Sequence, residues 1–337
     1  MYEVIAQGEG PLFMDPDADK ARAFFRQKKR ALVNKVMPLK DAISQFVQDG
    51  FYLGIGGFGA NRTPVAACHE IARQKKKNLI FCGHTSTHDY QILAAGESFN
   101  RCDIAYIIGI EIRGLSPNAR RYSESGKVQF CEWTNYALAL RLKAAAMGVS
   151  YLPGRNVLGT DTFKRSAAKL GRCPFTGKIY CLFPALWPDV SVIHVHEADI
   201  YGNARFEGIG ICDLELARAS KRLIITCERL IHNDEIRRHP SHTLIPNFLV
   251  DAVCEVPFGA FPGNMVDDYF SDEDHLRLWL ESEKDPATFK KFLDKYIYGV
   301  DDFEGYLELC GGIKRINQLR AEEHMIDLST QRSECHA

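Results

Sequence analysis

The sequence of 337 residues lacks the features that mark several large classes of protein. Its formal net charge is only −1, so it has no basic surplus of the kind that binds nucleic acid or an anionic membrane. No apolar run approaches the roughly 18 residues that a membrane-spanning helix needs, and the polar N-terminus does not resemble a signal peptide. We therefore expect a cytoplasmic protein with no nucleic-acid partner and no membrane association.

Metal-binding patterns are also missing. Eleven cysteines are present, but no two of them form a Cys-x-x-Cys pair, and most lie in apolar segments as expected for buried free thiols. His194 and His196 alternate along a predicted strand and would point to one face, but no third ligand stands at a useful spacing. We expect no metal site and no permanently bound cofactor.

Three common catalytic or nucleotide-binding motifs are absent as well. Ser86 has no surrounding Gly-x-Ser-x-Gly, which argues against a serine hydrolase. The glycine-rich stretch at residues 49–64 lacks the lysine and the spacing of a P-loop, and Gly208-Ile209-Gly210 lacks the third glycine of a dinucleotide-binding turn. No internal repeat or low-complexity tract is found.

What the sequence does contain is an alternation of short apolar strands with helices. Residues 51–55, 78–82 and 104–110 are such strands, and amphipathic helices separate them. Continuous apolar strands of this kind are typical of parallel sheets buried on both sides. The prediction is an α/β fold: an open, mainly parallel sheet with helices on both faces.

The chain divides into three predicted parts. Residues 1–35 form an N-terminal arm, residues 36–320 form the α/β domain with a helical tail from about residue 271, and residues 321–337 form a polar C-terminal tail. Residues 154–177 are irregular and polar, and we expect them to form a long excursion over the surface.

Residues 49–64 carry the strongest local pattern, a strand that runs into a glycine turn and then a helix. Gly56, Gly57 and Gly59 allow positive φ and a close approach of a ligand to the main chain. A helix that begins near Pro64 would direct free amide groups at an anionic group or an oxyanion over the turn. The structural alternative is a tight strand–helix connection with no ligand.

Two further loops follow strands and would lie at the same edge of the sheet. The first contains His84, Thr85 and Ser86, whose polar groups could orient a carbonyl or a carboxylate. The second contains Glu111 and Arg113.

The charged residues near these loops each have a functional and a structural interpretation. Burial at the end of an apolar strand would raise the pKa of Glu111 into a range useful for proton transfer. The alternative makes Glu111 a structural ion-pair partner of Arg113 or Arg62. Both arginines could clamp a substrate carboxylate, or they could be solvated surface residues.

The glycine stretch resembles the signature of A (alpha) subunits of family I CoA-transferases, in particular the glutaconate CoA-transferase type. The signature joins Asp-Gly, a few apolar residues, Gly-Gly-Phe and a Pro six residues after that Phe, and it is satisfied by Asp49, Gly50, Gly56, Gly57, Phe58 and Pro64. Gly54 interrupts the apolar residues, and Arg62 stands where the broad signature has Gly, as in the glutaconate-type branch. The likeness covers roughly residues 36–320 and includes the runs at 144–148, 198–203, 225–228 and 234–253.

This resemblance implies a CoA-transferase-like fold and a ping-pong transfer of CoA between a thioester and a free carboxylic acid. It places the nucleophilic glutamate in a Glu-x-Gly-x-x-Gly-like motif of a B subunit; here Glu207-Gly208 and Glu304-Gly305 lack the rest of that motif. The implied partners are the B subunit, in a heterodimer that assembles to a heterotetramer or larger, with acyl-CoA and a carboxylic acid as substrates. The residues expected to line the substrate at the subunit interface are Gly56, Gly57, Phe58, Gly59, Asn61, Arg62, His84, Thr85, Ser86 and Arg113.

Two alternatives stay open at this point. Relatives on the same scaffold act as ring-opening CoA-ester hydrolases or as acyl-CoA decarboxylases, and in such an enzyme Glu111 would be the catalytic carboxylate. The more remote alternative is a non-catalytic ligand sensor, although no DNA-binding extension or basic patch accompanies it.

Overall fold

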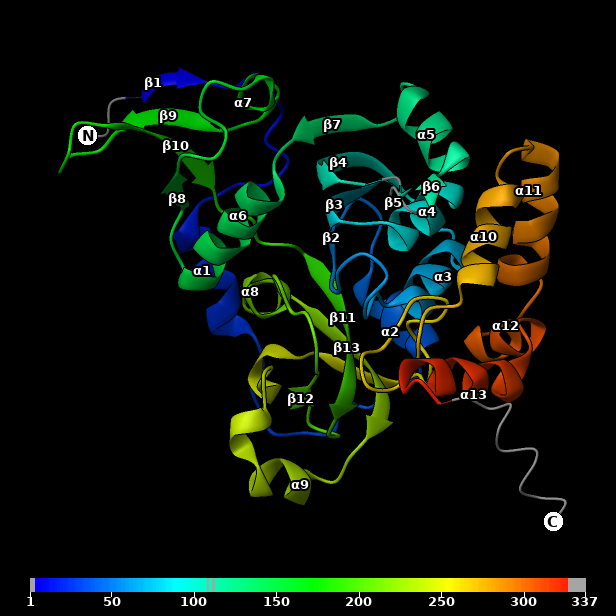
Figure 1. The fold of residues 1–337 in the computed structure, drawn as a ribbon. Coiled ribbons are helices and arrows are strands. Elements are labelled where there is room, and N and C mark those ends of the chain that lie inside the picture. Colours follow the sequence, from blue (N-terminus) through cyan, green and yellow to red (C-terminus); the bar gives the residue numbers. More distant parts are fainter. Residues whose placement is uncertain (1–3, 108, 111–112, 327–337) are drawn as a thin grey trace, which may run out of the picture.

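The computed structural model describes residues 4–107, 109–110 and 113–326, and an open eight-stranded sheet forms its centre (Figure 1). Seven strands pair in the order β14-β13-β11-β2-β3-β4-β7, all in parallel, and short β12 pairs antiparallel with β11. The expected open, mainly parallel α/β sheet is confirmed. The strands are β2 (Tyr52–Ile55), β3 (Leu79–Thr85), β4 (Phe99–Tyr106), β7 (Gln129–Glu132), β11 (Val190–Ala198), β12 (Ala204–Arg205), β13 (Leu223–Leu230) and β14 (Ala252–Glu255).

Both faces of the sheet are buried because alternate strand residues enter two different cores. On β3, Leu79 and Phe81 pack into one core, and Ile80 and Cys82 pack into the other. The first core is covered by α2 (Leu39–Phe46), α3 (Val65–Arg73), α4 (His88–Ala95) and α5 (Pro117–Glu124). The second is covered by α1 (Ala18–Gln27), α6 (Asn135–Met147) and α8 (Asp213–Ala219).

Helix α6 shows how the sequence sets these elements. Its Ala- and Leu-rich sequence has a high helix propensity. The Thr134 hydroxyl accepts a hydrogen bond from the Ala137 amide at 3.1 Å and caps the first turn. Gly148 ends the helix in the left-handed region at φ +71°.

A separate four-stranded antiparallel sheet lies at one end of the molecule, in the order β1-β9-β10-β8 (Figure 1). Its presence corrects the expectation that residues 154–177 are irregular, since α7 (Asp161–Arg165) and β9 fall within them. β9 and β10 form a hairpin across the turn at residues 173–178, whereas β1 pairs with β9 from the far end of the chain, and the polar sequence of β9 gives little sign of a strand. The strands are β1 (Val4–Gln7), β8 (Tyr151–Gly154), β9 (Lys169–Arg172) and β10 (Ile179–Pro184).

The C-terminal helices pack against α3 at the opposite end and enclose a third core around the buried Trp279 and Tyr306 (Figure 1). They are α10 (Glu273–Ser282), α11 (Pro286–Leu293), α12 (Phe303–Leu309) and α13 (Gly312–Glu323). The remaining elements are β5 (Gly109–Ile110), β6 (Gly114–Leu115), α9 (Asn233–Arg238), the 3-10 turns at Pro240–His242 and Asn247–Leu249, and a π turn at Asp294–Tyr298.

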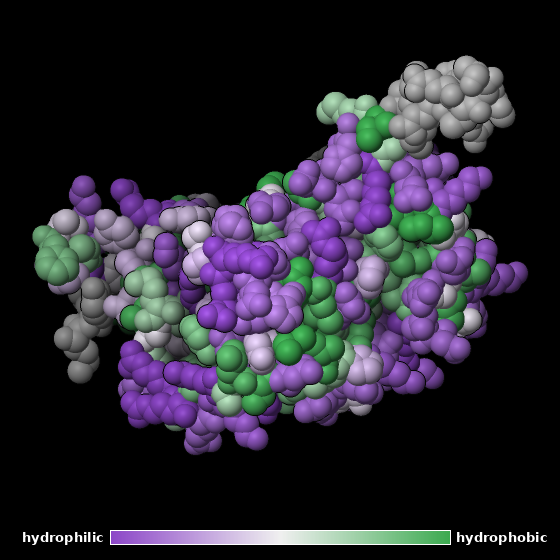
Figure 2. All heavy atoms as spheres, turned by 90° about the horizontal axis from the view of Figure 1, so that it is seen from below, coloured by the Kyte–Doolittle hydropathy of each residue, from purple (hydrophilic) through white to green (hydrophobic). Residues whose placement is uncertain are grey.

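The surface seen from below is mainly hydrophilic, with hydrophobic side chains gathered near its middle (Figure 2). None of the helices in the described ranges is long and apolar enough to cross a membrane. The predicted division at residues 35 and 320 stays a prediction.

Candidate active site

The glycine loop lies at the carboxyl end of β2, beside the loops that follow β3 and β4. The Gly59 amide donates to the Thr85 carbonyl at 2.9 Å, and the Thr87 hydroxyl donates to the Gly59 carbonyl at 2.8 Å. The Ser86 amide in turn donates to the Tyr106 carbonyl at 2.9 Å. The ends of the three strands therefore meet at one edge of the sheet, as the sequence predicts, although Glu111 itself lies outside the described residues.

The amides of the glycine loop are already engaged within the chain. Gly56 donates to the Val192 carbonyl at 2.9 Å, Gly57 donates to Asp213 Oδ1 at 2.9 Å, and Phe58 donates to the Asn61 carbonyl at 2.9 Å. The amides of these residues and of Gly59 are therefore not free in this chain, and the contact of the loop with a substrate oxyanion stays a prediction. The acceptors lie on strand β11, on helix α8 and within the loop itself. These hydrogen bonds therefore fix the conformation of the loop.

Arg62 lies inside the protein and is fully buried. Its Nη2 atom donates to Asp213 Oδ2 at 2.6 Å and to the Ile209 carbonyl, and its guanidinium carbon lies 4.0 Å from the centre of the Phe206 ring. The expectation of a substrate clamp is not met by this arrangement, and Arg62 is not a solvated surface residue either. Its guanidinium forms an internal ion pair with Asp213, and this pair connects the glycine loop to α8.

Asp213 is the residue that sequence reasoning missed in this loop. It is 3% exposed and bonds both Gly57 and Arg62, so it fixes two residues of the glycine stretch at once. The one local sign of it is an acidic residue directly before an apolar helical run, which is common at any helix start.

His84 and Thr85 belong to a polar cluster beside α6 and α8. Nε2 of His84 lies 3.4 Å from Cys212 Sγ, its Nδ1 lies 3.2 Å from Thr85 Oγ1, and Asn135 Nδ2 donates to that hydroxyl at 2.9 Å. Burial lowers the pKa of His84 and raises the pKa of the Cys212 thiol. The pair is a neutral imidazole and a protonated thiol, which suits a polar lining and does not suit a thiolate nucleophile.

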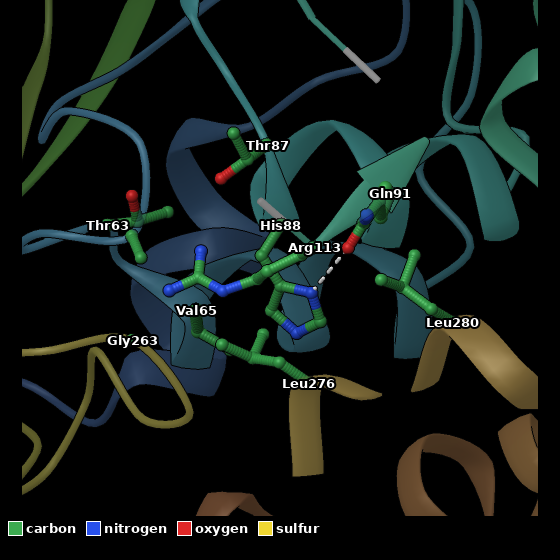
Figure 3. Close-up of a pocket in the computed structure, with 11 residues that line it drawn as sticks. Thr63, Val65, Thr87, His88, Gln91, Arg113, Gly263, Leu276 and Leu280 are labelled. Atoms are coloured by element: carbon green, nitrogen blue, oxygen red, sulfur yellow. Dashed lines mark hydrogen bonds between the residues drawn. The ribbon is translucent and has the colours of Figure 1, made fainter. Parts of the chain in front are cut away.

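Arg113 lines a small pocket beside the glycine loop, with a volume of about 20 Å³ (Figure 3). Its guanidinium makes two bonds to Glu273 on α10, at 2.7 and 2.5 Å. In the same pocket His88 shares a hydrogen bond between its Nδ1 and Gln91 Oε1 at 2.8 Å, and its buried Nε2 has no partner in the described structure. Because burial lowers the pKa of His88 to about 3, its Nε2 is an unprotonated hydrogen-bond acceptor.

A buried pair of His194 and Glu228 lies further along the same edge. Nε2 of His194 is 2.7 Å from Glu228 Oε1, and that oxygen also accepts from the Tyr269 hydroxyl at 2.8 Å. His196 points to the same face, as predicted, and contacts the Val266 carbonyl. Among the described residues no three His, Cys, Asp or Glu side chains are placed to share a metal ion.

Gly57 gives a direct test of the loop geometry. It has φ +86°, and a Cβ there would lie 2.7 Å from the Thr63 amide nitrogen and 2.8 Å from the Arg62 carbonyl carbon. We expect Gly57→Ala to lower the free energy of unfolding by more than the about 1–2 kcal/mol that the left-handed conformation alone costs. The matched control is Gly159→Ala, since Gly159 has φ +74° but open space around it. Equal destabilisation in urea unfolding would contradict the close approach.

The chain belongs to the coenzyme A transferase family, whose model matches residues 36–256. It is 30% identical to the A subunit of glutaconate CoA-transferase from Acidaminococcus fermentans over 302 residues, which cover 85% of this chain and 94% of that protein. It is 46% identical to an uncharacterized protein of Archaeoglobus fulgidus over 96% of this chain and 73% of that one.

Two solved structures agree with the family assignment. The crystal structure of glutaconate CoA-transferase from Acidaminococcus fermentans matches with a TM-score of 0.80 and 28% identity, over 85% of this chain and 95% of that chain. The crystal structure of a variant of the decarboxylase AibA/AibB matches with a TM-score of 0.71 and 28% identity, over 77% of this chain and 97% of that chain. The expected resemblance to the glutaconate CoA-transferase A subunit is confirmed, and with it the expectation of a CoA-transferase enzyme.

Proposed function

We propose that this chain is the A subunit of a two-chain enzyme that moves CoA between an acyl-CoA and a free carboxylic acid. The reaction is ping-pong, and its nucleophile is a glutamate of the B subunit. The CoA thioester is a substrate and is not a resident cofactor.

One observation carries this proposal: the acids described at the candidate site already have partners. Asp213 pairs with Arg62, Glu228 with His194 and Tyr269, and Glu273 with Arg113. A carboxylate held by two strong donors is a poor nucleophile because the attack must first break those bonds. The described acids at this site therefore favour a reacting carboxylate from another chain, and the missing Glu-x-Gly-x-x-Gly motif supports the same proposal.

The test compares this chain alone with a co-purified complex of this chain and a B chain that carries the motif. We expect no exchange of CoA between an acyl-CoA and an added carboxylate with the chain alone, and turnover with the complex. Full exchange activity in the isolated chain would contradict the proposal.

A CoA-ester hydrolase or decarboxylase is the second candidate, since a decarboxylase structure is among those that match. In that enzyme Glu111 would be the essential carboxylate. The complex would then open a ring of a CoA ester by hydrolysis, or release CO₂ from an acyl-CoA, without an acceptor acid, and Glu111→Gln would abolish that reaction. Normal turnover of Glu111→Gln in the complex would remove Glu111 from the catalytic role.

A further inference from the structure

A second polar cavity lies at the opposite edge of the sheet from the glycine loop. It is bounded by the end of α1, the following chain at residues 28–37, α2, and the residues directly before β13 and β14. Its volume is about 530 Å³. Because β2, β11, β13 and β14 are parallel, the amino ends of β13 and β14 lie away from the carboxyl end that holds the candidate active site.

Cations dominate the lining of this cavity, which we call the arm cavity: Lys28, Lys29, Lys35, Lys221 and Arg222 face one acid among its described lining residues, Asp251. Two of the cations are paired, since Lys28 bonds Asp251 at 2.8 Å and Lys221 bonds Asp189 at 2.7 Å. The ammonium of Lys28 also donates to the carbonyls of Lys221 and Leu249, so it has no spare donor. The surplus of positive charge therefore rests on the other three residues.

Of these three, Lys29 is exposed to solvent, whereas Lys35 is buried and Arg222 is half-buried, and both have unused donors. Lys35 is 8% exposed, and its ammonium makes one hydrogen bond, to the Asn247 carbonyl at 2.6 Å. The guanidinium of Arg222 makes neither a hydrogen bond nor an ion pair within the described part of the chain, although its backbone carbonyl accepts from the Ser191 amide. Its guanidinium carbon lies 5.8 Å from the centre of the Phe24 ring and 6.0 Å from that of Phe46. An anion between Lys35 and Arg222 would compensate their unpaired positive charges, which are costly to bury.

The burial of Lys28 and Lys35 also favours a bound anion in the arm cavity. Loss of water lowers the pKa of Lys28 and of Lys35, and Arg222 lowers the pKa of Lys28 further by like-charge repulsion. A bound anion would offset both effects, because it stabilises the charged forms of the lysines.

The apolar lining favours a ligand that has an apolar or aromatic part in addition to its anionic group. Phe24 and Phe46 stand beside the cations, and Val33, Met37 and Val250 line the same space. Arg and Lys bind phosphate oxygens well, and an aromatic face accepts a flat heterocycle. The volume of the arm cavity also exceeds what inorganic phosphate needs and lies within the about 300–1,000 Å³ that small-molecule pockets span.

We propose that the arm cavity binds a nucleoside diphosphate, with its phosphates on Arg222 and Lys35 and its base against Phe24 or Phe46. This site is separate from the candidate active site and does not depend on the proposed transferase function. A nucleotide there would tie the chain at residues 28–37 to α2 and to the starts of β13 and β14.

The test is calorimetric titration of the full-length protein with ADP, inorganic phosphate and adenosine. We expect ADP to bind more tightly than either fragment, and Arg222→Gln to weaken ADP binding by at least about tenfold. Lys35→Met should weaken it as well, and the thermal midpoints of both variants should be compared to show that each still folds. Arg277→Gln is the matched control, because Arg277 is exposed on α10 and pairs only with a neighbour on its own helix.

Two results would overturn the proposal. Unchanged ADP affinity in folded Arg222→Gln and Lys35→Met would place any bound ADP elsewhere, for example where the nucleotide part of CoA binds. Phosphate binding as tight as ADP binding would show a simple anion site with no place for the base. Catalytic exchange activity decides neither outcome, so a failure of the proposed transferase function stays distinguishable from a failure of this site.

Discussion

Replacing Arg62 by alanine is expected to destabilise this protein by about 3–5 kcal/mol, because it leaves Asp213 as an uncompensated charge inside the fold. Both partners of this ion pair are nearly inaccessible, with exposed side-chain fractions of 0% and 4%. The loss should be visible as a lower urea midpoint with an unchanged slope. In the purified complex the same substitution should reduce turnover, since Asp213 also holds the Gly57 amide.

Two comparisons separate this effect from a general sensitivity to mutation. Arg120→Ala removes a pair with Glu124 whose side chains are 63% and 64% exposed, and it should cost less than about 1 kcal/mol. Arg62→Met combined with Asp213→Asn removes both charges and keeps an oxygen for Gly57, so it should recover part of the lost stability. Equal losses for Arg62→Ala and Arg120→Ala would show that the buried pair has no special role.

Mild acid is expected to destabilise the contact between the C-terminal helices and α3 and α4. Three buried histidines meet there: His69, His88 and His275. Burial lowers the pKa of His69, lowers that of His88 to about 3 and lowers that of His275 to about 4. Each is neutral when folded but binds a proton near pH 6.5 when unfolded, so stability falls as the pH drops from about 6.5 toward 4.

The size of this effect follows from proton linkage. At pH 5, His88 and His275 should each cost about 2 kcal/mol relative to pH 7, and His69 adds to the loss. Asp89 works in the opposite direction: burial raises its pKa to about 6, so the folded form takes up its proton first and regains about 1 kcal/mol by pH 5. The sum remains a clear loss of stability.

His69→Phe isolates one member of this cluster. Both ring nitrogens of His69 are buried without a hydrogen-bond partner, and the ring packs edge-on against Phe303 and Tyr306. A phenyl ring keeps that packing and cannot be protonated, so the slope of stability against pH between 6 and 4.5 should fall by up to about 1.4 kcal/mol per pH unit. His239→Phe, at an exposed position, should leave the slope unchanged. An unchanged slope in His69→Phe would refute the assignment.

The sheet could be predicted because its information is local. Short apolar strands and amphipathic helices alternate, and β2 and β3 lie close to the strands predicted at residues 51–55 and 78–82. The antiparallel sheet could not be predicted, because its strand β9 consists of Lys169, Leu170, Gly171 and Arg172, which form no apolar strand pattern, and its second neighbour β1 lies at the far end of the sequence.

The candidate site could be located from sequence, but its internal bonding could not. Three loops at strand ends give its position, and Gly59 does meet Thr85. The role of Arg62 depends on Asp213, 151 residues away, and Glu228 meets His194 across 34 residues and a strand pair. Such partners are chosen by the folded arrangement of α8 and β13, which no local pattern encodes. Which of the predicted residues contact substrate stays a prediction.

The most direct test of the central claim is to find which carboxylate carries the CoA thioester. The complex of this chain with its B chain is incubated with acyl-CoA and treated with borohydride, which reduces an enzyme-bound thioester to an alcohol and inactivates the enzyme. Peptide mass spectrometry then locates the reduced glutamate. Our account predicts that it lies in the Glu-x-Gly-x-x-Gly motif of the B chain. A reduced carboxylate in this chain, at Glu111 or elsewhere, would contradict it.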